Sequence, residues 1–368
     1  AEWWYLNLLV KGEELSGGDT SDLGYVLSFS RIAGREALLS SRYNRDTDNF
    51  DEETNFGGNL SVNLEADEYL NVTYTNGATT AVLEQEQETS DGRKVYSLRG
   101  ETAQIGRFDL SLKERTVAPS GYNTPLLWGG STGNCKGQIS VFGQDDTYYY
   151  SIPDLDVSGT ITDVDGTVRE VKIGKAWIDH QWFNSSPPSD WLGHYWTSFH
   201  FTHSSDLYNN EPHQAVGYVT QFYEDGTRYT YWVKRNADGT NECGETGMLD
   251  VESYGTTNYP HQFSLGLKKD GVIFFNTAGY VFSDNQIFSP PAGTDFFEPA
   301  IFLSGSLEDK PFTGLGFFET HLQKGDLPLL PFKELVKLYG REDEETDLNG
   351  DDLVNGMDFG ELLKLNQQ

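Results

Sequence analysis

Short strand-like segments follow one another at intervals of roughly ten residues, and this spacing limits the fold more than any other feature. Asn76-Gly77 and Asp91-Gly92 stand between such segments, and both dipeptides favour tight hairpin turns. Connections this short leave no room for the crossover helices of a parallel sheet. We therefore expect an antiparallel up-and-down barrel or a sandwich. The segments of this region are residues 60–64, 70–74, 81–84, 94–99 and 108–114.

The same pattern continues in the second half of the chain. Strand-like segments occur there at residues 191–201, 215–223, 228–235, 262–267, 272–276, 300–305 and 315–321. A chain of 368 residues is too long for one ordinary core, so two domains or one large double barrel are expected. Aromatic residues, which favour strands, make up 14% of the chain. The sequence therefore predicts two successive β units joined near residues 155–170.

Residues 174–183 combine an acid, an imidazole and two indoles. Strand alternation directs Trp177 and Asp179 to one face, and His180 and Trp182 to the other. A bend or bulge would let the acid and the imidazole reach one cavity. Such a pair beside aromatic walls can move protons next to an apolar substrate. The alternative is that these residues are core aromatics around a satisfied polar pair.

The chain carries 57 acidic and 26 basic side chains, a net charge of −31. Nucleic acid and anionic membrane surfaces would repel this charge, so neither is an expected partner. No run of about eighteen apolar residues occurs, so no membrane span is expected. The acidic composition suits a secreted or extracytoplasmic protein, including one in a saline setting. Cys135 and Cys243 form one disulfide if the protein is exported, or remain two buried thiols.

Residues 347–358 have the donor spacing of a calcium loop and resemble a dockerin-type or EF-hand loop. Two replacements distinguish it from an EF-hand: Asp352 stands at position 6 and Asp358 at position 12. The alternative is an acidic, solvated tail. A dockerin has two loops and this chain has one, so a structural calcium clip is favoured over a cohesin-type partner. The expected ligands are Asp347, Asn349, Asp351, the carbonyl of Leu353, Asn355 and Asp358.

The sequence gives less support to zinc or an organic cofactor than to calcium. His194, His200 and His203 lie along or just past one strand-like segment, with His213 further on, and could bind zinc. Their spacing matches no familiar zinc site, and no Cys or Glu completes it. Neither a Gly-rich phosphate loop nor a Ser-elbow motif occurs, so no organic cofactor and no serine hydrolysis is expected.

Four motifs follow one another along the chain: residues 2–5 (EWWY), residues 148–153 (YYYSIP) with 157–160 (VSGT), residues 174–182 (GKAWIDHQW) and residues 314–319 (GLGFFE). In this order they resemble the AttH-like group, which includes carotenoid 1,2-hydratases (hydroxyneurosporene synthases), kievitone hydratase-like proteins and fungal lipocalin-like Diels–Alderases. The resemblance extends over about residues 1–325. Phe183 stands where the family motif usually has Gly, which bears on the size and shape of the substrate.

The resemblance implies an all-β protein of two lipocalin-like antiparallel β-barrels, at residues 1–160 and 161–325. Beyond the resemblance, residues 326–368 are expected to form a helical tail, because the apolar residues of 330–339 have helical spacing and a second short helix is expected at 359–365, with the single calcium loop between them. The substrate would bind in or between the barrels. By similarity, His180 and Trp182 match motif positions implicated in the hydratases. The aromatic residues expected around the substrate are Trp177, Trp182, Tyr195, Trp196, Trp4 and Tyr5.

These observations favour a cofactor-independent enzyme that acts on an apolar isoprenoid or polyene by hydration, isomerisation or cyclisation. Asp179 would be the acid if burial raises its pKa, and His180 would guide or deprotonate water. A non-catalytic lipocalin-like carrier of a hydrophobic ligand is the first alternative. A secreted polysaccharide-acting protein is the second, because aromatic-rich β proteins with a calcium module also bind sugars.

Overall fold

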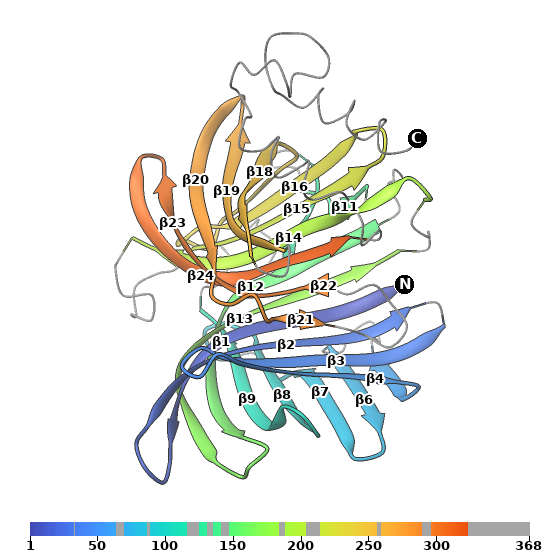
Figure 1. The fold of residues 1–368 in the computed structure, drawn as a ribbon, viewed down its shortest axis with the longest axis vertical. Helices are drawn as coiled ribbons and strands as arrows, with labels where there is room; N and C mark the ends of the chain where they lie inside the picture. Colours follow the sequence, from blue (N-terminus) through green and yellow to red (C-terminus); the bar gives the residue numbers. More distant parts are fainter. Residues whose placement is uncertain are drawn as a thin grey trace.

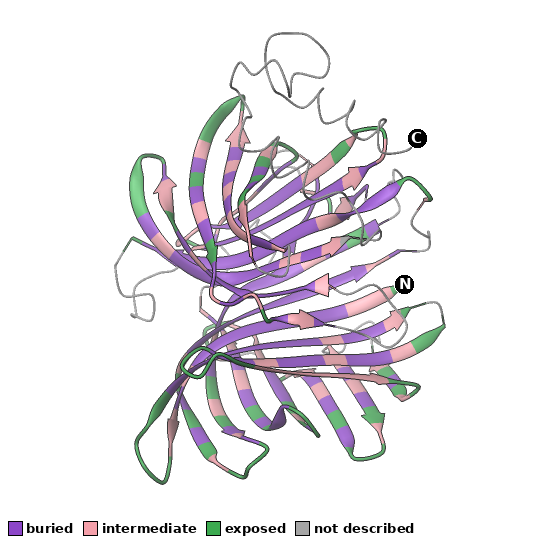
Figure 2. Cartoon of the chain, in the orientation of Figure 1, coloured by how far each residue is buried: buried purple, intermediate pink, exposed green. Residues whose placement is uncertain are grey.

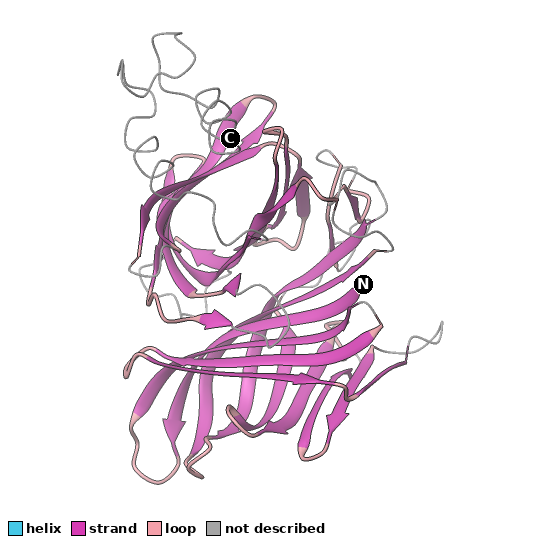
Figure 3. Cartoon of the chain, turned by 45° about the vertical axis from the view of Figure 1, so that its right-hand side comes forward, coloured by secondary structure: helices cyan, strands magenta, loops and turns pink. Residues whose placement is uncertain are grey.

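The computed structural model describes residues 1–32, 34–63, 70–86, 89–115, 125–130, 135–140, 147–183, 188–203, 214–255, 259–288 and 296–322. Every regular element within these ranges is a β-strand (Figure 3). None of the described segments forms a helix with the length and hydropathy that a membrane span requires. The predicted all-β class is therefore confirmed, whereas the predicted helical tail and its calcium loop lie outside the described residues.

Within the described residues, the first sheet has thirteen strands and curls into a half-barrel (Figure 1). Its order is β4-β3-β2-β1-β13-β12-β9-β8-β7-β6-β5, with β10 and β11 paired to β12, and all pairs are antiparallel. The strands are β1 (Glu2–Glu14), β2 (Thr20–Ile32), β3 (Arg35–Asn44), β4 (Asn49–Phe56), β5 (Asn59–Asn63), β6 (Asn71–Asn76), β7 (Thr79–Gln85), β8 (Val95–Thr102), β9 (Gly106–Glu114), β10 (Leu126–Leu127), β11 (Gln138–Ile139), β12 (Thr147–Thr162) and β13 (Val168–Trp182).

The second sheet has eleven strands in the part of the chain that the structure describes, and it curls into a second half-barrel. Its order is β17-β16-β15-β14-β24-β23-β20-β19-β18, and β22 joins β21 to β24. The strands are β14 (Trp191–Thr202), β15 (Gln214–Tyr223), β16 (Arg228–Arg235), β17 (Asn241–Gly244), β18 (Gly247–Tyr254), β19 (Pro260–Lys269), β20 (Val272–Val281), β21 (Ile287–Phe288), β22 (Phe296–Phe297), β23 (Ala300–Leu307) and β24 (Lys310–Leu322).

The predicted hairpins form at the predicted dipeptides. Gly77, in the turn between β6 and β7, has a φ of 61°, and Gly92, between β7 and β8, has a φ of 80°. Side chains other than glycine rarely adopt such angles, so these positions fix where each strand reverses.

The chain changes sheet later than predicted. β13 lies beyond the predicted domain boundary at residue 160, yet it pairs with β1 and β12 in the first sheet. The second sheet begins with β14, after Trp182. The reason is that β1 needs a second neighbour besides β2, and β13 supplies it over thirteen paired positions.

Three apolar cores follow from strand alternation. Even-numbered residues of β1, such as Trp4 and Leu6, fill the first half-barrel. Phe199 and Phe201 of β14 help to fill the second. The third core lies between the two sheets and takes Tyr5 and Trp177 from one sheet and aromatic residues from the other. The middle strands are therefore buried on both faces, as the purple bands of Figure 2 show.

A disulfide crosses this third core. Cys135 and Cys243 are bonded, with their Cα atoms 5.9 Å apart and a sequence separation of 108. Cys243 belongs to β17 of the second sheet, whereas Cys135 precedes β11 of the first. Of the two states that the sequence left open, the structure has the disulfide.

Candidate functional site between the two sheets

The segment around Asp179 is regular strand. In the pairing of β13 with β1, Tyr5 faces Asp179 and Trp4 faces His180, without a register shift at these positions. The pairing with β12 is equally regular there, with Ser151 opposite Asp179. Asp179 and His180 therefore point to opposite faces of β13. The sequence left open a bend that would bring both into one cavity. The strand has none at residues 179–182, where both neighbours pair in register, and the nearest register shift with β12 falls between Ile178 and Ala176.

Asp179 lies on the face toward the second sheet, with 2% of its surface exposed. Its carboxylate accepts hydrogen bonds from the Tyr149 hydroxyl at 2.6 Å, the Trp177 indole N–H at 2.6 Å and the Ser151 hydroxyl. Three donors from two neighbouring strands thus fix the orientation of one buried carboxyl group.

The indoles of Trp128 and Trp196 donate hydrogen bonds to two of these donors, Ser151 and Tyr149. Trp128 donates to the Ser151 hydroxyl at 2.7 Å, and Trp196 of the second sheet donates to the Tyr149 hydroxyl at 2.8 Å. The Trp128 and Tyr149 rings are stacked with centroids 4.5 Å apart. The network around Asp179 therefore spans both sheets and is enclosed by aromatic rings.

Burial raises the pKa of Asp179 from 3.8 to about 7. The hydrogen bonds from Ser151, Tyr149 and Trp177 lower this pKa, and the nearby charge of Glu319 raises it. The cost of removing the carboxylate from water exceeds the stabilisation that the three donors return. Near neutral pH this carboxyl group can therefore give up or take a proton.

His180 occupies the interior of the first half-barrel. Its ring is stacked on Trp4, with centroids 4.5 Å apart, and on Trp182 at 4.6 Å, while the Tyr150 ring meets its edge. Its Nε2 lies 3.2 Å from a Glu2 carboxylate oxygen, and its Nδ1 has no hydrogen-bond partner among the described residues.

The structure thus divides the predicted site residues into three groups. Trp177, Trp196 and Tyr5 lie with Asp179 between the sheets. Trp4 and Trp182 lie with His180 on the first-barrel side. Tyr195 is in the core of the second half-barrel, where it contacts Phe222 and Phe318. The six aromatic residues therefore do not line one cavity.

Two carboxylates that the sequence did not single out also lie between the sheets. The Tyr5 hydroxyl donates to Glu298. Burial raises the pKa of Glu298 well above its usual range, and the charges of Glu319 and Asp179 add to this. Glu319 ends the motif at residues 314–319, which was its one signal in the sequence.

Asn7 donates to the Ser198 hydroxyl at 2.8 Å and so also joins the two sheets.

Glu319 lies beside two histidines. The His194 Nε2 is 2.7 Å from its Oε1. Burial by itself would raise the pKa of Glu319, but His194 and His321 outweigh this effect and hold the pKa below its usual value. Burial and the neighbouring His194 lower the pKa of His321 to about 4.

The described histidines of the zinc hypothesis, His194, His200 and His203, do not form one cluster. His203 hydrogen-bonds the Pro311 carbonyl through Nδ1 at 2.8 Å, and His200 lies near the Trp177 ring, with ring centroids 6.4 Å apart. His213 and the proposed calcium ligands at residues 347–358 lie outside the described residues.

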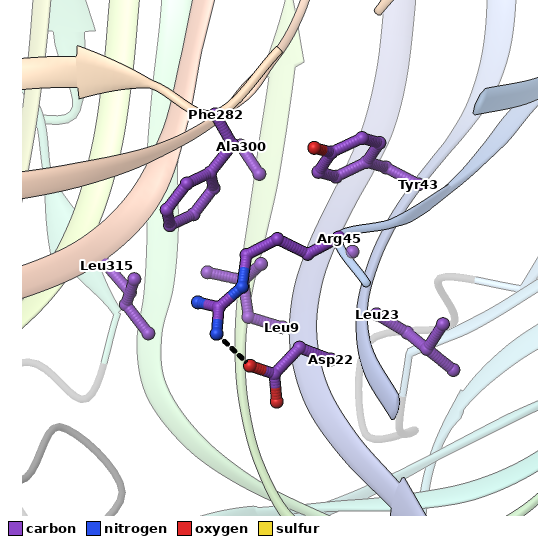
Figure 4. A pocket seen from close by; sticks show the side chains of 9 residues that line it. Leu9, Asp22, Leu23, Tyr43, Arg45, Phe282, Ala300 and Leu315 are labelled. Atoms are coloured by element: carbon purple, nitrogen blue, oxygen red, sulfur yellow. Dashed lines mark ion pairs between the residues drawn. The ribbon is translucent and has the colours of Figure 1, made fainter. Parts of the chain in front are cut away.

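A small pocket opens elsewhere between the sheets (Figure 4). An ion pair between Arg45 and Asp22 crosses it, and the Arg45 guanidinium lies 5.1 Å from the centroid of the Phe282 ring. None of the predicted site residues lines it. The lining residues are Leu9, Asp22, Leu23, Gly24, Tyr43, Arg45, Phe282, Ala300 and Leu315.

The sequence model of the AttH-like family matches residues 1–321. The chain belongs to the AttH-like family. Two solved structures share the fold of this AttH-like chain. A putative AttH from Nitrosomonas europaea has a TM-score of 0.60 at 19% identity, covering 87% of this chain and 91% of that one. Kievitone hydratase from Nectria haematococca has a TM-score of 0.61 at 16% identity, covering 88% and 89%. No curated protein matches the chain in sequence. The predicted family and lipocalin-like fold are thereby confirmed.

Proposed function

We propose that this AttH-like protein is a hydratase-type enzyme in which Asp179 protonates an alkene of an apolar substrate. The observation that carries the proposal is the buried Asp179 carboxyl, whose pKa of about 7 lies near a neutral working pH. A general acid is most effective when its pKa lies near that pH. The name of one structural neighbour, kievitone hydratase, supports the same reaction type.

In the proposed reaction a single group, Asp179, both donates a proton and recovers one. Protonated Asp179 gives its proton to one alkene carbon and becomes a carboxylate, and the other carbon becomes a cation. A water oxygen then bonds to that carbon, and the proton released from this water returns to Asp179. The net change is the addition of one water molecule, with the aspartic acid regenerated.

The surroundings suit a cationic intermediate. Trp177 and Trp196 supply π-faces between the sheets, and such faces stabilise positive charge. The low exposure of the site keeps bulk water from capturing the cation before the intended water does. We propose a linear isoprenoid or polyene as the substrate class, because its branched double bonds give tertiary cations.

The decisive experiment incubates wild type, Asp179→Asn and His180→Gln with a panel of linear isoprenoids and polyenes, followed by extraction and mass spectrometry. The proposal predicts a product one water heavier than its substrate, lost in Asp179→Asn and retained in His180→Gln. Loss in His180→Gln alone would place the chemistry inside the first half-barrel. Unchanged ligand recovered equally from all three proteins would leave a carrier and overturn the proposal.

The remaining proposals concern location and calcium. We propose that the protein is extracytoplasmic and that residues 347–358 hold a structural calcium ion. The disulfide between Cys135 and Cys243 supports the location, because disulfides persist in oxidising compartments.

A further inference from the structure

Two neighbouring strands bring His194, Glu319 and His321 together. His194 of β14 is paired directly with His321 of β24. Glu319 lies two residues before His321, so both project from the same face of β24. Strand geometry alone therefore directs two imidazoles and one carboxylate to the same place, although more than a hundred residues separate β14 from β24.

The distances suit a metal ion. One ligand atom from each residue lies within 4.8 Å of the others, and among the described residues this is the one such group of three His, Cys, Asp or Glu side chains. Zinc binds imidazole nitrogen and carboxylate oxygen at about 2.0 to 2.2 Å. Three donor atoms of the types that zinc binds are therefore gathered in one place.

An ion could reach this cluster. The side chain of His194 is 18% exposed and that of Glu319 is 21% exposed. Trp191 stacks on His194, with ring centroids 6.0 Å apart, and meets the edge of His321 at 5.8 Å. A hydrophobic shell beside metal ligands controls how far solvent reaches the site.

We propose that His194, Glu319 and His321 bind one divalent transition-metal ion of the zinc class, with an open position for water. Two histidines and a carboxylate are the ligand set of several catalytic zinc sites, in which water fills the fourth position. This inference goes beyond the proposed hydration and does not depend on it.

The chain contains a matched control for the alternative, a simple ion pair between histidine and carboxylate. His261 Nδ1 lies 2.8 Å from Asp284 Oδ1, a contact like that between His194 and Glu319. The described residues bring no further ligand to His261 that would complete a group of three. His261→Gln therefore removes a histidine from such a pair without touching the proposed site.

The test titrates zinc into the metal-free full chain by calorimetry. Millimolar calcium is present throughout, so that all-oxygen sites are occupied. Wild type and His261→Gln should bind one zinc ion with equal affinity. His194→Gln and His321→Gln should weaken binding by more than about 100-fold, because even the outer partners of zinc ligands contribute about 10- to 100-fold. Equal affinity in all four proteins, or no binding by wild type, would overturn the inference.

A measurement on wild type alone guards against variants that fail to fold. The chain has seven histidines, so its imidazole nitrogen NMR spectrum is simple enough to follow during a zinc titration. Zinc should shift the signals of two histidines, which are assigned to His194 and His321 in wild type itself by their through-space contacts with the Trp191 ring. Shifts confined to other histidines would contradict the proposed site.

Discussion

Asp179→Asn should change how the stability of the protein depends on pH. Burial raises the pKa of Asp179 from 3.8 to about 7, so the native state keeps a proton between these values that the unfolded state has lost. Unfolding then releases a proton, and the stability of the wild type falls as pH rises through this window. Three pKa units at 1.36 kcal/mol each amount to about 4 kcal/mol, of which about 3 kcal/mol falls between pH 5 and pH 8.

Asparagine does not titrate, so this loss disappears in the variant. Its amide cannot accept the Tyr149 hydroxyl proton in place of the lost oxygen, which costs about 1 to 3 kcal/mol at every pH. That cost shifts the whole stability curve without changing its slope. The free energy of unfolding of Asp179→Asn, relative to wild type, should therefore rise by about 3 kcal/mol from pH 5 to pH 8.

The assay is urea unfolding followed by tryptophan fluorescence, with both proteins measured in the same buffer at each pH so that other titrating groups cancel. Asp225→Asn is the control. The backbone N–H and side chain of Thr227 hold the pKa of Asp225 below its usual value, so this group does not titrate between pH 5 and pH 8. If the Asp179→Asn difference is as flat as the control, Asp179 titrates as an ordinary carboxyl and the reasoning fails.

Three further predictions concern the surrounding structure. Tyr149→Phe removes a hydrogen bond that lowers the pKa of the buried aspartate, so this pKa should rise further in a spectroscopic titration; an unchanged value would contradict the network. Replacing Cys135 and Cys243 by alanine should lower the free energy of unfolding by about 5 kcal/mol, given the length of the closed loop; a variant as stable as wild type would show that the bridge adds nothing. Gly316→Ala places a methyl group against the backbone of β14 and should sharply reduce soluble yield, whereas Gly266→Ala meets no atom within 4 Å and should be tolerated; equal yields would refute the packing argument.

The hairpin spacing predicted the β architecture well, because turn residues and alternation are local properties of the chain. Gly77 and Gly92 mark where strands reverse, and both could be identified without the structure. The change of sheet could not be placed in this way. β13 pairs with β1 across more than 150 residues, and no local signal shows which strand closes the other edge of β1.

The site was predictable only in part, for the same reason. Alternation correctly separated Trp177 and Asp179 from His180 and Trp182, and both neighbouring strands pair in register at residues 179–182, so no bulge there brings the acid and the imidazole together. The meeting of His194 with His321 depends on the pairing of two strands far apart in the chain. Neither the regular pairing at residues 179–182 nor the contact between His194 and His321 could be inferred from residue spacing within one segment.

Infrared difference spectroscopy tests the central claim most directly, by following the carbonyl band of protonated Asp179 in wild type minus Asp179→Asn across pH 4 to 9. The account predicts a band that survives well above pH 5 and loses half its intensity near pH 7. A band already lost by about pH 5, as for an ordinary aspartate, would show that Asp179 is a carboxylate at neutral pH and cannot be the acid.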